Sequence, residues 1–160
     1  MAGRVVIILG SGSDEDFAKQ IWSTLEKYNV AYDKRVISAH KRPGALLDLL
    51  KENEKSSDDI VYITVAGRSN ALSAVVDCNT RYAVIACPPY SEKFGGMDIY
   101  SSLRMPGGAT PLVVLEPENA ALAAVKILSY GDSALRSRIS EAQKAMVDKN
   151  TADDEKIRKS

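Results

Sequence analysis

Short runs of apolar residues alternate along the chain with longer segments that mix apolar and polar positions. Continuous runs rich in Val, Ile and Ala are typical of strands buried on both faces of a parallel sheet. Such runs predict five strands, at residues 5–9, 31–37, 59–66, 83–87 and 112–115. The segments around them are predicted to be helices, over residues 14–28, 43–54, 70–78, 117–130 and 132 to about 149.

This alternation of strands and helices predicts one α/β domain over residues 1–160, with right-handed crossovers between parallel strands. Five strands with helices on both faces are typical of the flavodoxin-like three-layer fold, with strand order 2-1-3-4-5. A C-terminal helix follows, and the polar tail over about 150–160 is expected to fray. That helix has few large apolar residues, and two interpretations stay open: it packs on another subunit, or it is an ordinary surface helix.

Charge limits the partners that this domain is expected to have. Lys and Arg total 21 and Asp and Glu total 21, so the formal net charge is zero. A balanced charge argues against nucleic acid, which favours a basic face, and against a polybasic membrane anchor. The apolar run near the N-terminus is too short for a membrane helix and lacks a cleavage site, which predicts a cytoplasmic protein.

Residues that hold metals and cofactors are scarce. The chain has one histidine, His40, and two cysteines, Cys78 and Cys87, with no Cys-x-x-Cys pair. A single histidine does not complete the usual structural zinc site, and the cysteines are interpreted as small apolar residues near the sheet. The sequence also lacks a Gly-x-Ser-x-Gly elbow, a receiver-domain aspartate after the third strand and paired acids at strand ends. We therefore expect neither a metal nor a cofactor.

Four loops are expected at the edge of the sheet where its strands end, which is where open parallel sheets bind ligands. The first, residues 10–14, reads Gly-Ser-Gly-Ser-Asp and precedes a helix. Small residues allow a ligand close to the backbone, and a helix N-terminus offers free N–H groups to an anion. The loop matches neither the Walker A motif nor the dinucleotide fingerprint. Asp14 has two interpretations, a ligand-binding carboxylate or a simple helix N-cap.

The second loop, residues 38–43, contains His40 between a hydroxyl and two cations. Neighbouring cations favour the neutral imidazole, which is able to accept a proton near neutral pH; a structural histidine is the alternative. Lys41 and Arg42 are interpreted either as phosphate ligands or as a solvated pair. The third loop, residues 66–70, again precedes a helix, and the fourth, residues 88–111, is long enough to indicate function. Together the loops indicate a phosphate-bearing small molecule and one histidine for proton transfer.

Three segments resemble motifs of the aminoimidazole ribonucleotide carboxylase and mutase family. Residues 8–14 resemble its MGSxSD loop, residues 38–43 its SAHR-x-P loop and residues 105–108 its MPGG segment. The likeness covers residues 4 to about 130, with the motifs in the family's order and spacing. It implies reversible carboxylation of 5-aminoimidazole ribonucleotide (AIR) to 4-carboxy-AIR (CAIR) in de novo purine biosynthesis, without a cofactor. It also implies a homo-oligomer, either an octamer or a tetramer.

The family has two classes. One moves a carboxylate from the exocyclic nitrogen to C4 of the imidazole, and the other adds free carbon dioxide to C4 without ATP. Lys41 in place of the usual Arg, and residues 67–70 in place of a GGAAHLPG-like loop, resemble the direct carboxylases, as do residues 87–89 and 98–104. The mutase reaction is the alternative, and a non-catalytic flavodoxin-like nucleotide-binding module is a more distant one.

The same resemblance implies roles for individual residues. His40 would move the C4 proton, because carboxylation leaves a hydrogen that must be removed to restore the aromatic ring. Substrate binding falls to seven residues: Ser11, Ser13, Asp14, Ser38, Lys41, Gly67 and Ser69. The three serines of the first two loops and the lysine would hold phosphate, and the aspartate would accept from ribose hydroxyls. Gly67 and Ser69 would approach the imidazole and carbon dioxide.

Overall fold

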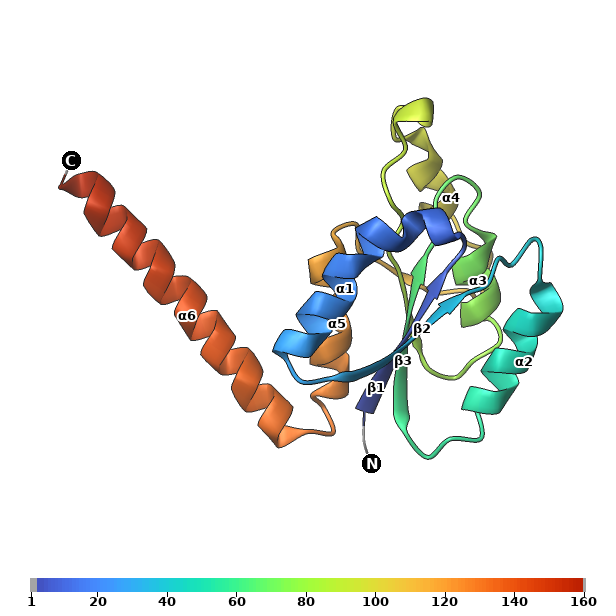
Figure 1. Cartoon of the computed structure of the whole chain (residues 1–160), viewed down its shortest axis with the longest axis horizontal. Coiled ribbons are helices and arrows are strands. Elements are labelled where there is room, and N and C mark those ends of the chain that lie inside the picture. The colour runs from blue at the N-terminus through green and yellow to red at the C-terminus, as the bar shows by residue number, and fades with distance from the viewer. Residues whose placement is uncertain (1–2, 160) are drawn as a thin grey trace.

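Five parallel strands, in the order β2-β1-β3-β4-β5, form the centre of the computed structural model, which describes residues 3–159 (Figure 1). The strand order and the flavodoxin-like α/β fold predicted from the sequence are confirmed. The strands are β1 (Gly3–Leu9), β2 (Ala31–Val36), β3 (Asp59–Val65), β4 (Ala83–Ala86) and β5 (Leu112–Val113).

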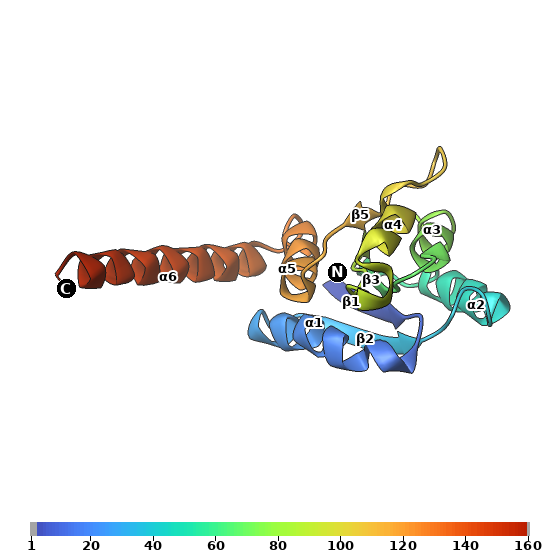
Figure 2. The ribbon, with the colours of Figure 1, turned by 90° about the horizontal axis from the view of Figure 1, so that it is seen from above.

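Helices cover both faces of this sheet (Figures 1 and 2). One face packs against α1 (Glu15–Lys27) and α5 (Pro117–Leu128), and the other against α2 (Pro43–Asn53) and α3 (Ala71–Asp77). Strand β1 shows why: Val5, Ile7 and Leu9 point into the first core, whereas Val6 and Ile8 point into the second. Side chains of a strand alternate between faces, so an unbroken apolar run supplies both cores at once.

The register brings the carboxyl ends of β1, β2 and β3 to one level. Leu9 at the end of β1 pairs with Val36 of β2 and with Val65 of β3. Backbone bonds continue the sheet just beyond these ends, since Gly10 N donates to Val65 O at 2.8 Å and Ile37 N donates to Leu9 O at 2.9 Å. The loops that follow β1, β2 and β3 therefore begin side by side.

The segment 88–111 contains short helical turns that the sequence analysis did not predict. They are η2 (Glu92–Phe94), η3 (Met97–Ile99) and α4 (Tyr100–Leu103), and this part of the chain lies near the carboxyl ends of the strands (Figure 1). Gly95 and Gly96, with φ of 56° and 79°, make the bend between the first two turns. A Cβ at Gly96 would lie 2.7 Å from the ring of Tyr90, so this position requires glycine for space as well as conformation.

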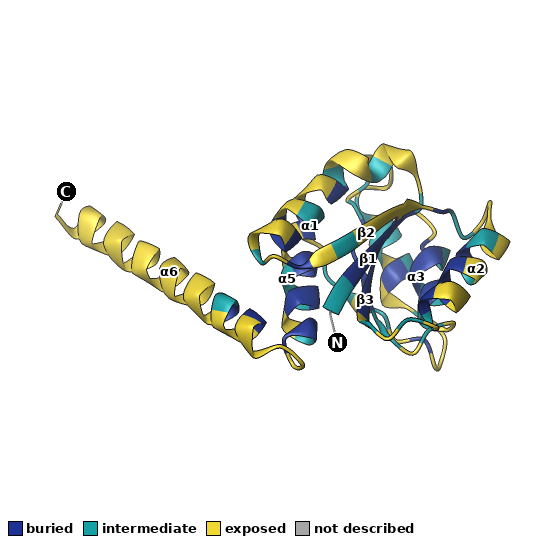
Figure 3. Ribbon diagram, turned by 60° about the horizontal axis from the view of Figure 1, so that its bottom comes forward, coloured by how far each residue is buried: buried dark blue, intermediate teal, exposed yellow. Residues whose placement is uncertain are grey.

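Helix α6 (Ser133–Arg158) extends away from the rest of the molecule (Figures 1 and 3). Its N-cap is Asp132, whose side chain accepts the Leu135 N–H at 2.9 Å. The predicted end near residue 149 is wrong: residues 150–158, where fraying was expected, are helical. Charges four residues apart favour this extension, as in the pairs Lys144–Asp148 and Asp154–Arg158. Between residues 3 and 159, no helix is long and apolar enough to cross a membrane.

Candidate functional site

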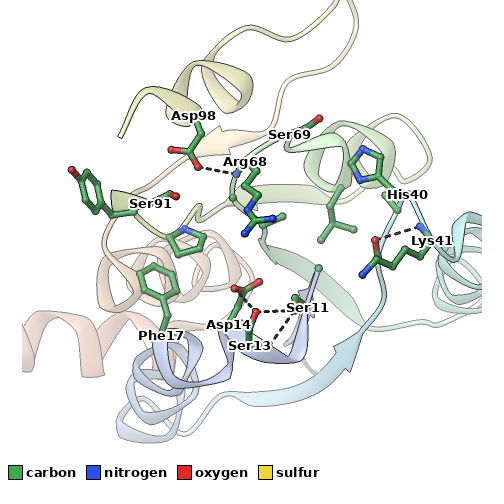
Figure 4. A pocket seen from close by; sticks show the side chains of 18 residues that line it. Ser11, Ser13, Asp14, Phe17, His40, Lys41, Arg68, Ser69, Ser91 and Asp98 are labelled. Carbon is green, nitrogen blue, oxygen red and sulfur yellow. Dashed lines mark hydrogen bonds between the residues drawn. The ribbon is translucent and has the colours of Figure 1, made fainter. Parts of the chain in front are cut away.

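A cavity of about 530 Å³ opens at the carboxyl ends of the strands, between the loops after β1, β2 and β3 and the segment after β4 (Figure 4). Its position follows from the shared level of the strand ends, where the first turns of the following loops meet. All eight residues to which the sequence analysis gave a catalytic or binding role line it: Ser11, Ser13, Asp14, Ser38, His40, Lys41, Gly67 and Ser69.

The loop after β1 presents hydroxyl groups to the cavity. Ser11 Oγ accepts the Ser13 N–H at 3.2 Å and thereby caps the short 3-10 helix η1 (Gly12–Asp14). The two hydroxyl oxygens lie 2.8 Å apart, and Ser13 Oγ donates to Asp14 Oδ1 at 3.4 Å. This arrangement places two hydroxyls and a carboxylate at the start of α1, where the helix dipole favours an anion.

Asp14 is not a simple N-cap. It precedes α1, but its side chain accepts no capping hydrogen bond from that helix. Partial burial raises the pKa of this carboxyl above its ordinary value, against the hydrogen bonds from Ser13 and from the Ser11 backbone and the positive charge of Arg68. The carboxylate faces the cavity (Figure 4), so its remaining acceptor sites are available to hydroxyl groups of a ligand.

The loop after β2 carries the histidine. Ser38 holds the turn, because its carbonyl accepts the Arg42 N–H at 2.9 Å and its hydroxyl accepts the Lys41 N–H at 3.4 Å. His40 and Lys41 line the cavity (Figure 4), whereas Arg42 lies outside the lining at the start of α2. Within the described part of the chain, the imidazole of His40 makes no hydrogen bond. Both ring nitrogens are therefore open to a ligand.

The loop after β3 reaches the cavity with Gly67, Arg68 and Ser69. Asn70 ends the loop as the N-cap of α3, since its side chain accepts the Ser73 N–H at 3.2 Å. Arg68 belongs to this loop in the sequence, but no role was predicted for it. Its guanidinium points into the cavity toward the Asp14 side (Figure 4).

The segment after β4 contributes lining residues to which the sequence analysis gave no role, among them Tyr90 and Asp98. Asp98 Oδ2 accepts the backbone N–H of Arg68 at 2.8 Å, which joins this segment to the loop after β3. The length of 88–111 indicated function, and residues 98–104 resembled the direct carboxylases, but no single residue of this segment was predicted to lie at the cavity.

Neither cysteine is placed for chemistry at this site. Cys87 is buried, and burial, together with the negative charge of Glu116, raises the pKa of its thiol to about 12. Cys78 is exposed at the end of α3. Over residues 3–159, no three His, Cys, Asp or Glu side chains gather closely enough to hold a metal ion.

Taken together, the lining groups suit an elongated, phosphorylated small molecule. Serine hydroxyls, the start of α1 and the ammonium of Lys41 offer donors to an anion, and Asp14 offers an acceptor to hydroxyls. The imidazole of His40 is able to exchange a proton, and Arg68 adds a second cation.

Comparisons with protein families, curated proteins and solved structures all lead to the same kind of protein. A family model described as AIR carboxylase matches residues 4–149. The phosphoribosylaminoimidazole carboxylase of Archaeoglobus fulgidus is 52% identical over 140 residues, covering 88% of this chain and 77% of that protein. The phosphoribosylaminoimidazole carboxylase of Treponema denticola is 44% identical over 159 residues, covering 99% of this chain and 100% of that protein. The crystal structure of Treponema denticola PurE superposes with a TM-score of 0.94 at 45% identity, covering 96% of this chain and 98% of that one.

Proposed function

The chain belongs to the AIR carboxylase family, and from this premise we propose that it adds free carbon dioxide directly to C4 of AIR, without ATP. Carboxylation of AIR in purine biosynthesis is its activity, which makes it a carboxy-lyase. The direct use of carbon dioxide is the finer claim. It rests on the loop after β3: Arg68 and Ser69 line the cavity there, and this loop resembles that of the direct carboxylases.

The phosphate and ribose of AIR bind at the β1 and β2 loops in this proposal. The hydroxyls of Ser11, Ser13 and Ser38, the N–H groups at the start of α1 and the ammonium of Lys41 hold the phosphate. Asp14 accepts hydrogen bonds from the ribose hydroxyls. The support is that these side chains line one cavity and that the Asp14 carboxylate is not used to cap α1.

The imidazole ring then lies between His40 and the loop after β3. Gly67 has no side chain, which leaves the backbone open to the ring, and the hydroxyl of Ser69 is able to donate to an oxygen of carbon dioxide. C4 attacks the carbon of carbon dioxide, a carbon–carbon bond forms, and one carbonyl electron pair moves onto oxygen. The ring, now positively charged, keeps its hydrogen at C4.

His40 takes that hydrogen as a proton and the ring becomes aromatic again, which gives CAIR and one proton overall. In the reverse direction the same imidazole protonates C4 before carbon dioxide leaves. Histidine suits this position because an imidazole is able both to accept and to donate a proton. No step in this scheme uses a metal or a cofactor.

We also propose that the protein acts as a homo-oligomer, an octamer or a tetramer, in the cytoplasm. The support for the oligomer is helix α6, whose buried side chains, Leu135 and Ile139, lie near its start. Met146 and Val147 are 67% and 59% exposed on the part that extends from the domain (Figure 3). A helix of this length with exposed apolar residues is suited to packing against a second copy.

The experiment that tests the proposed function supplies AIR and bicarbonate without ATP and measures CAIR. CAIR formation at a rate that follows enzyme concentration is the expected result. Supplying the N5-carboxylated isomer instead is the matched comparison, since the mutase uses only that compound. If CAIR forms from the isomer and not from AIR and bicarbonate, the chain is a mutase and the proposal is wrong. Tight binding of flavin mononucleotide with neither activity would make it a nucleotide-binding module.

A further inference from the structure

Arg68 has a backbone conformation that arginine rarely adopts. Its φ is +56°, in the left-handed region, where a side chain with a Cβ is crowded by the backbone. The other described non-glycine residue with positive φ is Asn29, a type that tolerates this region. Such conformations persist where the surrounding structure enforces them, and they are concentrated at functional sites.

Side chains from the segment after β4 enforce the conformation of Arg68. Asp98 Oδ2 accepts its N–H at 2.8 Å, and Ser101 Oγ lies 2.6 Å from its carbonyl oxygen. The Ser101 hydroxyl also accepts the Asn70 N–H at 3.1 Å, and Asn70 Nδ2 donates to the buried hydroxyl of Ser102 at 2.9 Å. Both backbone groups of the arginine are thus fixed by one segment from elsewhere in the sequence.

The side chain of this arginine is directed into the cavity, where its positive charge favours the ionised form of Asp14 but no hydrogen bond or salt bridge from the described residues holds it. Its guanidinium is drawn in the middle of the lining residues in Figure 4, and it makes no hydrogen bond or salt bridge with any other residue from 3 to 159. A guanidinium whose donors make no hydrogen bonds in a ligand cavity is suited to an anion of the ligand, because it presents a planar fork of donors.

The cavity lining contains two Lys or Arg side chains, Lys41 and Arg68. The product CAIR carries two anionic groups, the phosphate and the carboxylate at C4. Lys41 belongs to the loop of the proposed phosphate site, whereas Arg68 lies between Gly67 and Ser69, which the proposed function places at the reacting ring. Building on that proposed function, we propose that Arg68 binds the carboxylate that forms at C4 and that Asp98 and Ser101 position it.

This role has a consequence for rate as well as for binding. Negative charge develops on the oxygens of carbon dioxide as the carbon–carbon bond forms, and a guanidinium at this place stabilises that charge in the transition state. The backbone of Arg68 is held in place before the substrate arrives, so only its side chain has to adjust during the reaction. The strained backbone of Arg68 is explained if it fixes the direction of the guanidinium.

The test measures the dissociation constants of AIR and CAIR separately, in a His40→Asn background that prevents turnover. Arg68→Ala is expected to raise the dissociation constant of CAIR by at least about tenfold and that of AIR by less than about twofold, because only CAIR has the carboxylate. Lys41→Ala is the matched control and is expected to weaken both, because both carry phosphate. Retained AIR affinity also shows that the variant is folded.

Two results would overturn the proposal: equal weakening of AIR and CAIR by Arg68→Ala, which would assign the arginine to phosphate or ribose, or no weakening of either. Failure of the proposed function is a separate result, since it would be seen as wild-type enzyme that does not interconvert AIR and carbon dioxide with CAIR.

The positioning role is tested with Asp98→Ala and Asp98→Asn. Asparagine keeps an oxygen that accepts the Arg68 N–H, whereas alanine does not. Asp98→Ala is therefore expected to weaken the binding of CAIR and not that of AIR, as Arg68→Ala does. Asp98→Asn is expected to retain the wild-type ratio of the two dissociation constants. The positioning role of Asp98 is disproved if Asp98→Asn behaves like Asp98→Ala, or if Asp98→Ala leaves the ratio of the two dissociation constants unchanged.

Discussion

At the scale of single residues, the chemistry depends on side chains that the fold places at the cavity without hydrogen-bond partners. His40 has no hydrogen bond within residues 3–159, while the backbone of the next residue, Lys41, is fixed by Ser38. Hydrogen bonds thus hold the backbone of this loop, while the ring nitrogens of His40 stay open to a ligand. The same contrast holds at Arg68, whose backbone is fixed and whose guanidinium is not.

Replacing His40 by Asn is expected to lower kcat by at least about 100-fold, because the proton at C4 then has no base in place. The KM for AIR is expected to change by less than about threefold, since phosphate and ribose contacts remain. Steady-state carboxylation and decarboxylation rates measure both quantities. Turnover near the wild-type level in the variant would remove His40 from the mechanism.

Asp14→Asn is expected to stabilise the ligand-free protein while weakening substrate binding. Burial raises the pKa of this carboxyl. Its contribution to stability is therefore present at pH values below its unfolded pKa and is lost as pH rises through the folded pKa. Near pH 7 the ionised carboxylate is unfavourable to folding, so the variant is expected to gain about 1–2 °C in Tm. The gain is expected to shrink near pH 4.

Thermal unfolding at the two pH values measures this effect, and Asp16→Asn is the matched control. The exposed Asp16 is hydrogen-bonded to Lys19, which lowers its pKa, so its replacement should bring no gain at neutral pH. A Tm for Asp14→Asn below that of the wild type near neutral pH would contradict the prediction.

The residues that were predicted from the sequence to lie at the cavity share a simple property: each belongs to the loop that follows a strand. A parallel sheet gathers such positions at one edge, so sequence order was enough to place them. Asp98 could not be found this way. Its bond to Arg68 joins positions 30 residues apart and depends on how the segment after β4 docks, which no local pattern records.

At the scale of elements, helix α6 is the feature that the domain itself explains least. Ala-rich α5 is buried along its length, whereas α6 buries two side chains near its start and then leaves the body of the molecule. Its sequence supports a long helix through charge pairs such as Lys144–Asp148 rather than through an apolar face. The pattern of apolar residues ends early, which is why the sequence analysis placed the end of the helix too soon.

Introducing glutamate at both Met146 and Val147 is expected to lower the oligomeric state, because it places charge on exposed apolar residues that are proposed to meet a second copy. Light scattering after size exclusion measures the mass in solution. Ala145→Glu with Ala152→Glu adds the same charge to other exposed positions of α6 and is expected to leave the mass unchanged. Equal masses for the wild type and both double variants would show that this part of α6 is no interface.

At the scale of the whole molecule, the two cores on either side of the sheet hold the loops after β1, β2 and β3 in register. The segment after β4 then closes one side of the cavity and fixes Arg68. The loops after β1 and β2 thus offer hydroxyls and the ammonium of Lys41, and the loop after β3 offers a second cation. Two cations from different loops match a substrate that carries a phosphate and gains a carboxylate.

Exchange of labelled carbon dioxide into CAIR tests the direct use of carbon dioxide most directly. The enzyme is incubated with unlabelled CAIR and isotopically labelled bicarbonate, without ATP, and the carboxylate of CAIR is followed by mass spectrometry. Reversible decarboxylation is predicted to bring label into CAIR at a rate that follows enzyme concentration, and the His40→Asn variant is predicted to bring in almost none. CAIR that stays unlabelled while its N5-carboxylated isomer appears would contradict the proposal.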